Sequence, residues 1–326
     1  MKRVLVTAIG SFSADAVIQY LKQEGCMVIG CDIYPGEWVA NALDVDRFYQ
    51  APLASDQEKY LNFLDAICAK EKINYLIPLT DVEVDILNMN RERFEAKEII
   101  LCISGENCIR LCRNKYLLYH HLKQYGGIQL ISTELLEKQD CEKIDYPVIV
   151  KPYDGRSSQG LQYIRNYEEM AYFIEHHDIS KYIVQPQIEG SIVTVDVIRD
   201  DQHQIKTAVC RRELLRTLNG AGLSVQVFRD ERLEREAAQL ADYLQIQGCV
   251  NFEFICTKEG KYYFLECNPR FSGGVKFSCM AGYNFIVNHL KCFTGEDIES
   301  QCNVKEMYIA RKYQEIITEV KGRQID

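Results

Sequence analysis

The sequence of 326 residues lacks features that would place it in several classes of protein. No stretch approaches the run of about 18 apolar residues that crosses a membrane, so we expect no transmembrane helix and no membrane partner. The apolar run near the N-terminus is short and strand-like, and Asp15 follows it closely, which argues against a signal peptide. The sequence has only 38 Lys and Arg residues against 47 Asp and Glu residues, and the resulting net charge of −9 argues against a nucleic-acid partner.

Paired cysteine motifs are also absent, although the chain has 14 cysteines. None forms a Cys-x-x-Cys pair, and the smallest spacings join Cys108 to Cys112 and Cys26 to Cys31. The pattern favours thiols that pack as small core side chains in a reducing compartment over a zinc site or a redox pair. We therefore expect a cytoplasmic protein.

The first hundred residues alternate strands with helices but lack a complete dinucleotide fingerprint. Strands are predicted at 2–9, 27–33, 74–79 and 99–104, and helices at 13–25, 56–72 and 82–98. This alternation indicates an open parallel sheet with helices on both faces. Only Gly10 remains of the Gly-x-Gly-x-x-Gly pattern, which disfavours NAD binding even though Asp32 ends the second strand.

Beyond residue 110 the pattern becomes largely antiparallel. Strands are predicted within 146–164 and at 181–190, 191–200, 206–214, 249–258 and 261–268, with helices at 114–126, 168–177 and 233–245. We therefore predict an α/β (α+β) fold in three parts, with an N-terminal Rossmann-like domain at 1–110 and two further parts at 111–184 and 185–326.

A lysine and a glycine-rich loop follow a strand in VIVKPYDGRSSQG, residues 148–160. Lys151 ends the strand, small residues let backbone N–H groups turn toward an anion, and Ser157 and Ser158 add hydroxyl donors. The loop is not a P-loop, because Lys151 precedes the glycines, whereas the lysine of a P-loop follows them. A plain hairpin loop with a lysine reaching to solvent is the competing interpretation.

An extended stretch with a proline, YIVQPQIEG, covers residues 182–190. Its edge can match adenine, with the carbonyl of Pro186 accepting from the amino group and the amide of Ile188 donating to N1. Proline would act only through its carbonyl, so its missing N–H is no disadvantage there. A strand at a solvent-exposed edge is the alternative.

Two acidic strands follow, in NFEF and FLECNPR, and the tight turn TKEGK joins them. Folded as a hairpin, they bring Glu253 near Glu266, and the amide of Asn268 completes a set of oxygen ligands that suits Mg²⁺ with water and phosphate. Arg270 would stabilise charge on a transferring phosphoryl group. A glycosidase also uses a carboxylate pair but has little use for the adjacent Asn and Arg, and a solvated surface hairpin is the remaining alternative.

Together these motifs resemble the ATP-grasp superfamily, in particular proteins similar to the large subunit of carbamoyl phosphate synthetase. The resemblance covers nearly the whole chain and includes the N-terminal domain, with LIPLTDVE at 76–83 after its third strand. It also includes the Glu-x-Asn-Pro-Arg run that starts at Glu266, with Glu253 13 residues upstream. It implies ATP as co-substrate with Mg²⁺ or Mn²⁺. It also implies a two-lobed ATP-grasp region, with the small lobe at 111–184 and the metal site in the lobe at 185–326.

The resemblance also implies a role for each matching residue. Lys115 and Lys151 contact the phosphates, and Lys151 and Arg270 also act in catalysis. The flap over the phosphates matches Ser157, Ser158 and Gly160. The nucleotide hinge matches Gln185, Pro186, Gln187, Ile188 and Glu189. The Mg²⁺ ligands match Glu253, Glu266 and Asn268. Ile192 stands where the family usually has a ribose-binding glutamate, so either Glu189 substitutes or nucleotide affinity is weaker.

The acceptor side is less constrained by the sequence. The segment CRRELLRTLNGAG at 210–222 holds Arg211, Arg212 and Arg216, and alternation aims the first two at opposite faces. We predict that Arg211 clamps a substrate carboxylate, with a charged edge strand as the equal alternative. The backbone at 272–274 could donate to the same substrate.

Asp81 and Glu83 lie at the end of a parallel strand, a usual position for ligand contacts. However, Thr80-x-x-Glu83 is also a helix capping box, and we favour that role.

The reaction implied by the resemblance is ligation. A carboxylate attacks the γ-phosphate of ATP, and an amine then displaces phosphate from the acyl phosphate. The expected partners are therefore a small-molecule carboxylate and an amine, and a homodimer is expected from the family. A carbamate- or carboxyphosphate-forming kinase and a non-catalytic nucleotide-binding module are the alternatives.

Overall fold

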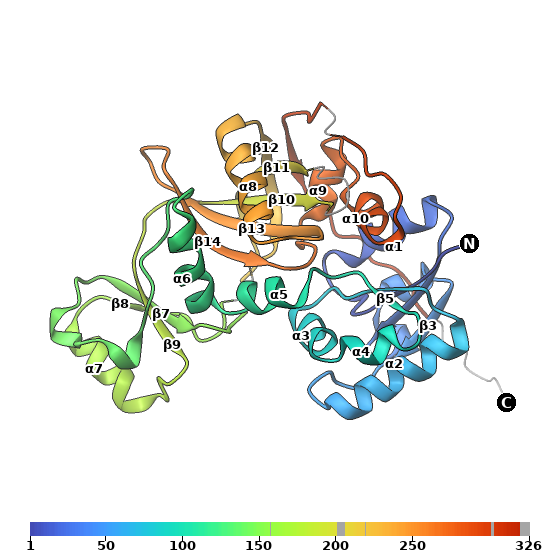
Figure 1. Ribbon diagram of the computed structural model, residues 1–326, viewed down its shortest axis with the longest axis horizontal. Coiled ribbons are helices and arrows are strands. Elements are labelled where there is room, and N and C mark those ends of the chain that lie inside the picture. Colours follow the sequence, from blue (N-terminus) through green and yellow to red (C-terminus); the bar gives the residue numbers. More distant parts are fainter. Residues whose placement is uncertain (157, 201–205, 219, 301–302, 320–326) are drawn as a thin grey trace.

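The computed structural model describes residues 1–319 apart from 157, 201–205, 219 and 301–302. Three β-sheets organise the chain (Figure 1), with five, four and six strands. We call the elements β1 to α5 the N-terminal unit, α6 to β9 the small lobe, and β10 to β15 the large lobe. The small lobe and the N-terminal unit lie on either side of the lower half of Figure 1, with the large lobe above them.

The N-terminal unit is built on a parallel sheet of order β3-β2-β1-β4-β5, as the alternation predicts. Its strands are β1 (Arg3–Val6), β2 (Met27–Asp32), β3 (Arg47–Gln50), β4 (Tyr75–Ile77) and β5 (Ile100–Leu101). Its helices are α1 (Ala14–Gln23), α2 (Gln57–Glu71), α3 (Asp81–Met89), α4 (Arg91–Glu95) and α5 (Glu106–Cys112), with short 3₁₀ turns at Gly36–Trp38 and Ala40–Leu43.

Three features of this unit depart from the predicted pattern, and one of them is α5, because no helix was predicted at Glu106–Cys112. The edge strand β3 was not predicted, because RFYQ has no buried position and therefore no alternating apolar signal. The helix predicted at 82–98 is broken at Asn90, whose side-chain amide donates to the carbonyl of Ile86 at 2.8 Å and competes with the helix backbone. Asp32 accepts the backbone N–H groups of Gly10 and Tyr34 at 2.7 and 3.1 Å.

The small lobe carries a four-stranded antiparallel sheet of order β6-β9-β7-β8. Its strands are β6 (Glu134–Leu135), β7 (Val148–Pro152), β8 (Gln162–Ile164) and β9 (Tyr182–Pro186), and its helices are α6 (Lys115–Tyr125) and α7 (Tyr167–His176), with 3₁₀ turns at Leu136–Lys138 and Cys141–Lys143. Met170 and Phe173 of α7 pack with Val148, Val150 and Ile164 in a small core of their own. The lobe is therefore held by its own hydrophobic cluster.

The large lobe carries an antiparallel sheet of order β14-β13-β10-β11-β12-β15. Its strands are β10 (Ser191–Arg199), β11 (Lys206–Arg216), β12 (Gly222–Phe228), β13 (Gly248–Cys256), β14 (Tyr262–Asn268) and β15 (Met307–Ala310), and its helices are α8 (Glu231–Tyr243), α9 (Val275–Met280) and α10 (Phe285–Thr294). The strands β12 and β15 were not predicted. β15 is a four-residue edge strand with no buried position, so its sequence carries little strand signal.

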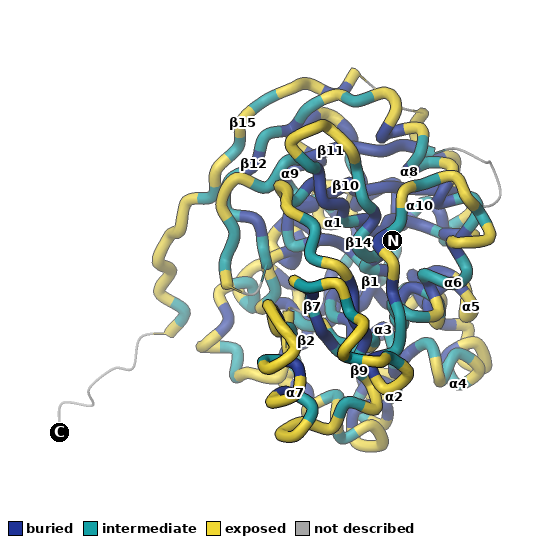
Figure 2. The backbone as a smooth tube through the Cα atoms, turned by 90° about the vertical axis from the view of Figure 1, so that its left-hand side faces the viewer, coloured by how far each residue is buried: buried dark blue, intermediate teal, exposed yellow. Residues whose placement is uncertain are grey.

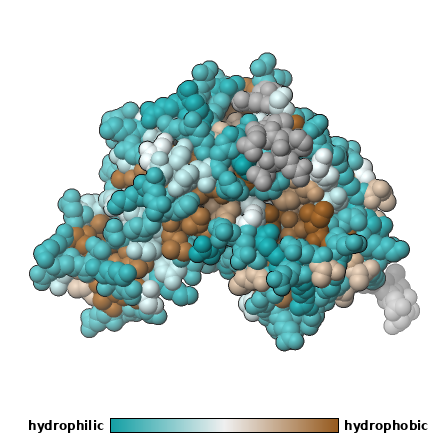
Figure 3. All heavy atoms as spheres, in the orientation of Figure 1, coloured by the Kyte–Doolittle hydropathy of each residue, from teal (hydrophilic) through white to brown (hydrophobic). Residues whose placement is uncertain are grey.

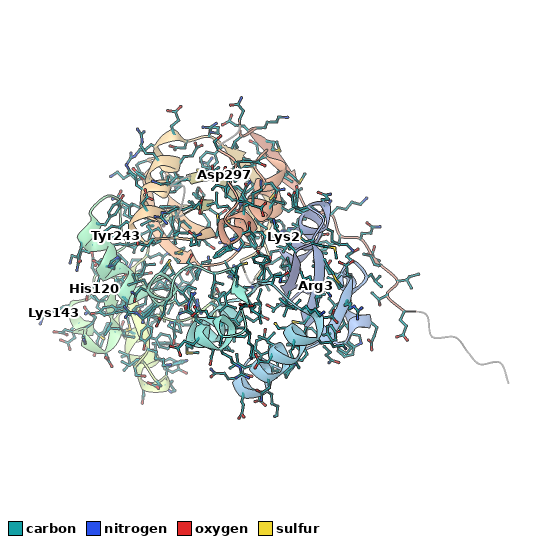
Figure 4. All side chains as sticks on the ribbon, turned by 45° about the vertical axis from the view of Figure 1, so that its right-hand side comes forward. Lys2, Arg3, His120, Lys143, Tyr243 and Asp297 are labelled. Carbon is teal, nitrogen blue, oxygen red and sulfur yellow. The ribbon has the colours of Figure 1, made fainter. Side chains whose placement is uncertain are left out.

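Buried residues follow the sheets, and the exposed residues lie along the outer loops (Figure 2). Leu233, Ala237 and Leu240 of α8 pack on Val195 and Val197 of β10 in one cluster. At the molecular surface Lys2 pairs with Glu296. Arg3 pairs at 3.5 Å with Glu71, which is buried. Figure 4 shows Lys2 and Arg3 on the N-terminal unit, with His120 and Tyr243 at the opposite side of the molecule.

The cysteine pattern agrees with the favoured interpretation. The 13 cysteines within the described residues are free thiols, and all except Cys141 are buried. Cys302 lies outside the described residues. Within the described part of the chain, no helix is both long enough and apolar enough to cross a membrane.

A buried histidine joins the N-terminal unit to the large lobe. Nδ1 of His289 on α10 accepts the backbone N–H of Cys249 at 2.8 Å, so its Nε2 carries the proton and donates to the carbonyl of Cys102 at 3.2 Å. Burial lowers the pKa of His289 to about 4. Protonation would place a second N–H against the amide of Cys249, so the folded protein favours the neutral ring.

We expect the pH dependence of stability to report this histidine. The folded-state pKa lies below the unfolded value of 6.5, so stability should be full above pH 6.5 and decline as the pH falls toward 4. The loss should approach roughly 3 kcal/mol. Urea unfolding of the wild type and of His289→Gln, measured from pH 4.5 to 8, tests this, because the Gln variant should lose that part of the slope. Equal slopes in the two proteins would contradict the assignment.

Candidate active site

A cleft of about 830 Å³ opens where the three units meet. The space-filling view shows the molecule hollowed between the small lobe and the N-terminal unit (Figure 3). The predicted site residues that line this cleft are Lys115, Lys151, Ser158, Gln185, Pro186, Gln187, Ile188, Glu189, Arg211, Glu253, Glu266, Asn268 and Arg270. Residues from sequence-distant motifs thus share one cavity, which is the usual form of a small-molecule site.

The two glutamates face the cleft from adjacent strands of the β13–β14 hairpin. Glu253 and Glu266 are directly opposite each other in the register, and Asn251 is opposite Asn268. Directly opposed residues of antiparallel strands project to the same face, so these side chains form one polar row. The side-chain amide of Asn268 donates to Oε1 of Glu253 at 3.3 Å. The predicted convergence of the two carboxylates is therefore present.

Two lysines reach the same cleft from the small lobe. Lys115 starts α6, where Asn114 caps the helix by accepting the N–H of Leu117 at 3.0 Å. Nζ of Lys115 lies 3.3 Å from Oε2 of Glu266 and donates to the carbonyl of Gly155 at 2.7 Å. Lys115 thus links the hairpin of the large lobe to the glycine-rich loop of the small lobe.

Lys151 lies at the end of β7 and is nearly fully buried. Burial lowers its pKa to about 8, and the neighbouring charge of Glu266 only partly opposes this shift. The side chain therefore retains its charge at neutral pH but loses it within the range of a laboratory titration.

The two glutamates respond oppositely to this environment. Burial and the neighbouring Glu266 raise the pKa of Glu253, and Arg216 only partly offsets them. For Glu266, burial opposes ionisation, but Lys115 and Lys151 outweigh it and lower the pKa of that carboxyl. Glu266 is thus the more readily ionised member of the pair.

The donor set fits Mg²⁺ bound jointly by protein and phosphate. Among the described residues, no group of three or more His, Cys, Asp or Glu side chains is placed to hold a metal ion. Mg²⁺ typically takes one or two carboxylates together with water and substrate phosphate oxygens. Glu253 and Glu266 supply two carboxylates on one face. Asn268 lies next to them with its amide nitrogen toward Glu253, and its amide oxygen, which accepts from Arg270 at 3.4 Å, is the atom that it would offer to a metal. These residues would hold the metal together with a phosphate-bearing ligand.

The other predicted nucleotide residues lie along the small lobe. Gln185 of β9 is anchored by its side-chain amide, which donates to the hydroxyl of Thr133 at 2.7 Å. Gly190, between this hinge and β10, approaches the backbone so closely that a Cβ would lie 2.4 Å from the carbonyl of Cys256. Gly160 has φ +72° and packs on Pro152 rather than lining the cleft. Ser157 lies outside the described residues. The roles of these residues stay predictions.

Ile192 and Glu189 both line the cleft at the start of β10. Ile192 is opposite Ile255 of β13 in the register, so this position presents an apolar wall where the family usually has a glutamate. Glu189 is exposed at the cleft edge, which leaves its carboxylate free to accept hydrogen bonds there. Its substitution for the missing glutamate stays a prediction.

The predicted capping role of Thr80-x-x-Glu83 is confirmed, because the structure forms both bonds of the capping box. Asp81 does more than begin α3. Its carboxylate accepts a two-pronged contact from Arg270, with Nε at 3.1 Å and a terminal nitrogen at 2.9 Å. Burial opposes ionisation of Asp81, but the guanidinium of Arg270 keeps its pKa below the usual value. The N-terminal unit thus orients the predicted catalytic arginine.

Two arginines of β11 line the cleft, at different depths. Arg211 is fully buried and bonded to Asp196, Ser278 and, at 3.1 Å, Ser272. Arg216 is more accessible and donates to Oε2 of Glu253 at 3.2 Å. Arg212 points to the opposite face, where its guanidinium lies 5.3 Å from the ring of Phe228. The clamping role predicted for Arg211 stays a prediction, and its guanidinium is engaged below the cleft surface.

Sequence reasoning missed Arg311, which follows β15. Its guanidinium donates to the carbonyls of Gly222, at 2.9 Å, and Gly273, and it lies over the rings of Phe12 and Phe277. Arg311 therefore joins the β11–β12 turn, the loop after β14 and the N-terminal unit. No local motif surrounds Arg311, so its function was not accessible from the sequence.

Family profiles match most of the chain in three segments. The profile described as "PylC-like, N-terminal domain" matches residues 4–102, "D-ala D-ala ligase C-terminus" matches 122–214, and "ATP-grasp in the biosynthetic pathway with Ter operon" matches 178–316. With the three-sheet fold and the lysine–carboxylate cleft, these matches show that the chain belongs to the ATP-grasp superfamily.

Within this superfamily the chain resembles carbamoyl phosphate synthase large chains. It is 24% identical to that of Thermoplasma acidophilum over 283 residues, which is 80% of this chain and 26% of the relative. It is 24% identical to that of Clostridium beijerinckii over 247 residues, 62% of this chain and 22% of the relative. It is also 30% identical to the D-alanine–D-alanine ligase of Petrotoga mobilis over 106 residues, 32% of this chain and 35% of the relative. The chain thus spans only about a quarter of the synthase large chains.

Solved structures support the fold. The biotin carboxylase domain of Hydrogenobacter thermophilus 2-oxoglutarate carboxylase superposes with a TM-score of 0.76 at 19% identity, covering 94% of this chain and 73% of that one. The L-amino acid ligase of Bacillus licheniformis gives 0.70 at 16% identity, covering 90% and 74%. At these identities the likeness establishes the shared architecture.

The pKa of Lys151 leads to a prediction for nucleotide binding. Lys151 should lose its charge above pH 8, so the affinity for metal-free ADP should fall by up to about tenfold per pH unit there. Calorimetric titration from pH 7 to 9.5 measures this. Lys151→Arg should bind ADP with little pH dependence, because arginine stays protonated. If the variant showed the same decline as the wild type, another group would be responsible.

Proposed function

We propose that the protein is an ATP- and Mg²⁺-dependent ligase that activates a carboxylate as an acyl phosphate and joins it to an amine. One observation carries this proposal. The carboxylate pair and the two lysines face each other across one cleft, and Nζ of Lys115 lies 3.3 Å from Oε2 of Glu266. One ligand in the cleft could thus contact lysines that bind its phosphate oxygens and carboxylates that bind its metal ion. ADP and phosphate would leave with the product.

In this proposal the small lobe binds the nucleotide. The carbonyl of Pro186 and the amide of Ile188 take the adenine, and Lys115 and Lys151 contact the phosphates. The loop around Ser158 covers the phosphates and keeps water from the acyl phosphate. The proposal is supported by the position of Gln185–Glu189, Lys115 and Lys151 along the lining of the same cleft.

The large lobe would hold the transferring group. Glu253, Glu266 and Asn268 would bind Mg²⁺, and the bound ion would neutralise the charge of the phosphates. Arg270, oriented by Asp81, would donate to an oxygen of the γ-phosphate or acyl phosphate. No side chain of the protein needs to become covalently attached in this scheme, because the substrate carboxylate is the attacking group.

We further propose that the chain divides into domains at 1–110, 111–184 and 185–326, each built on one of the three sheets, with α5 and β9 extending two residues past these bounds. We also propose that the protein forms a homodimer. The dimer is supported by the biotin carboxylase domain of 2-oxoglutarate carboxylase, whose solved structure is described as a dimer.

A second candidate is a kinase that forms carboxyphosphate from bicarbonate. It is favoured by the synthase large chains among the relatives and by the 2-oxoglutarate carboxylase neighbour, which was solved with MgADP and bicarbonate. The same cleft would serve both reactions, because bicarbonate is the smallest carboxylate-like acceptor.

ADP release separates these candidates. We expect ADP formation from ATP and Mg²⁺ to need both a carboxylate and an amine from a panel of amino acids and sugar acids. ADP and phosphate release with bicarbonate alone would instead favour the kinase. A protein that binds nucleotide but releases ADP with no member of the panel would be the non-catalytic module, and the ligase proposal would fail.

The metal assignment makes a separate prediction. Glu266→Ala should lower the ATP turnover rate by about a hundredfold or more, because several kcal/mol of charge stabilisation depend on the metal. It should also weaken Mg²⁺-ADP binding in calorimetry while the thermal unfolding midpoint stays within a few degrees. Glu259→Gln, in the exposed turn of the same hairpin, is the control and should behave as wild type. Normal turnover in Glu266→Ala would show that the metal lies elsewhere.

A further inference from the structure

Arg216 is hydrogen-bonded to Glu253, a predicted metal ligand, and its side chain is also accessible from the cleft. One terminal nitrogen donates to Oε2 of Glu253 at 3.2 Å, and Nε donates to the carbonyl of Gly220 at 2.7 Å. Its side chain is 27% exposed, whereas that of Arg211 is 1% exposed. A ligand in the cleft can therefore reach the guanidinium of Arg216 without moving the sheet.

The turn between β11 and β12 holds this guanidinium in place. The N–H of Thr217 donates to the carbonyl of Ala221 at 2.9 Å, and the N–H of Ala221 donates to the hydroxyl of Thr217 at 3.0 Å. Gly220 has φ +85°, and a Cβ there would lie 3.3 Å from Arg216. Glycine thus allows both the turn and the close contact with the arginine.

Arg216 and a metal ion would compete for the same carboxylate. Oε2 of Glu253 accepts from Arg216, and Oε1 accepts from Asn268 at 3.3 Å, so both oxygens already have donors. A divalent cation on Glu253 would repel a guanidinium a few ångströms away, and burial weakens the screening of that repulsion. Arg211 and Arg270 differ, because Asp196 and Asp81 neutralise them and neither is a predicted metal ligand.

We infer that Arg216 exchanges partners during the proposed reaction. It neutralises Glu253 until a divalent cation takes that carboxylate, and it then binds an anionic oxygen of the carboxylate substrate or of the acyl phosphate. Arginine suits this task because its planar fork fits a carboxylate or a phosphate equally well. The inference rests on the proposed function, and it identifies Arg216 as the arginine that couples metal binding to acceptor binding.

Coupling of this kind has opposite effects on two affinities. Removal of the arginine should strengthen metal binding, because a competing cation is lost. It should also weaken anion binding in the presence of metal, because the released guanidinium is the anion's partner. A merely structural role would weaken both or change neither.

The first test uses Mn²⁺ alone as the probe, followed by electron paramagnetic resonance. Arg216→Gln should bind Mn²⁺ about fivefold more tightly than the wild type, at the low end of measured coupling. Arg212→Gln, on the opposite face of the same strand, should match the wild type. Unchanged or weaker Mn²⁺ binding by Arg216→Gln would overturn the inference.

The second test uses inorganic phosphate, with and without Mg²⁺-ADP, in calorimetry of the full chain. In the wild type, Mg²⁺-ADP should tighten phosphate binding about tenfold, and Arg216→Gln should abolish this gain. Arg216→Lys should keep part of it, since the charge remains but the fork is lost. If the gain persisted in Arg216→Gln, the inference would be wrong while the proposed ligase could stand. If the wild type bound no Mg²⁺-ADP, both would fail.

Discussion

The repulsion between Glu253 and Glu266 is the constraint on which the rest of the site depends. The register of the β13–β14 hairpin sets these two carboxylates directly opposite each other in a partly buried cleft. Such a pair is stable only beside compensating charge, because burial strengthens repulsion between like charges. The compensation comes from Lys115 and Lys151 of the small lobe and from Arg216 of the large lobe.

The need for compensation explains why the cleft lies where three units meet. Each unit contributes charge that another unit neutralises, as when Asp81 of the N-terminal unit holds Arg270, which is 189 residues away in the chain. His289 and Arg311 join the N-terminal unit to the large lobe outside the carboxylate pair. The geometry of the site is therefore a property of the assembled fold, and no single unit contains it.

Local patterns were sufficient for much of this arrangement. A short turn between two strands forces a hairpin, and Glu253 and Glu266 then converge with few alternatives. The parallel sheet followed from strands that alternate with amphipathic helices, and the capping box of Thr80 and Glu83 depends on residues only three apart. The polar edge strands β3 and β15 were missed, because partners far along the chain, rather than an apolar repeat, make them strands.

The sequence alone therefore determined much of the succession of strands and helices and the carboxylate hairpin, because each depends on neighbours within a few residues. That Lys115 and Lys151 face this hairpin depends on the assembled fold. Tertiary structure alone decided which arginine of β11 meets Glu253. Arg211 and Arg216 are five residues apart, so a regular strand would aim them at opposite faces. Register shifts between Glu213 and Arg216 turn the second back toward the cleft. These register shifts arise from the pairing of β11 with β12. They could not be predicted from the alternation of residues along β11 alone.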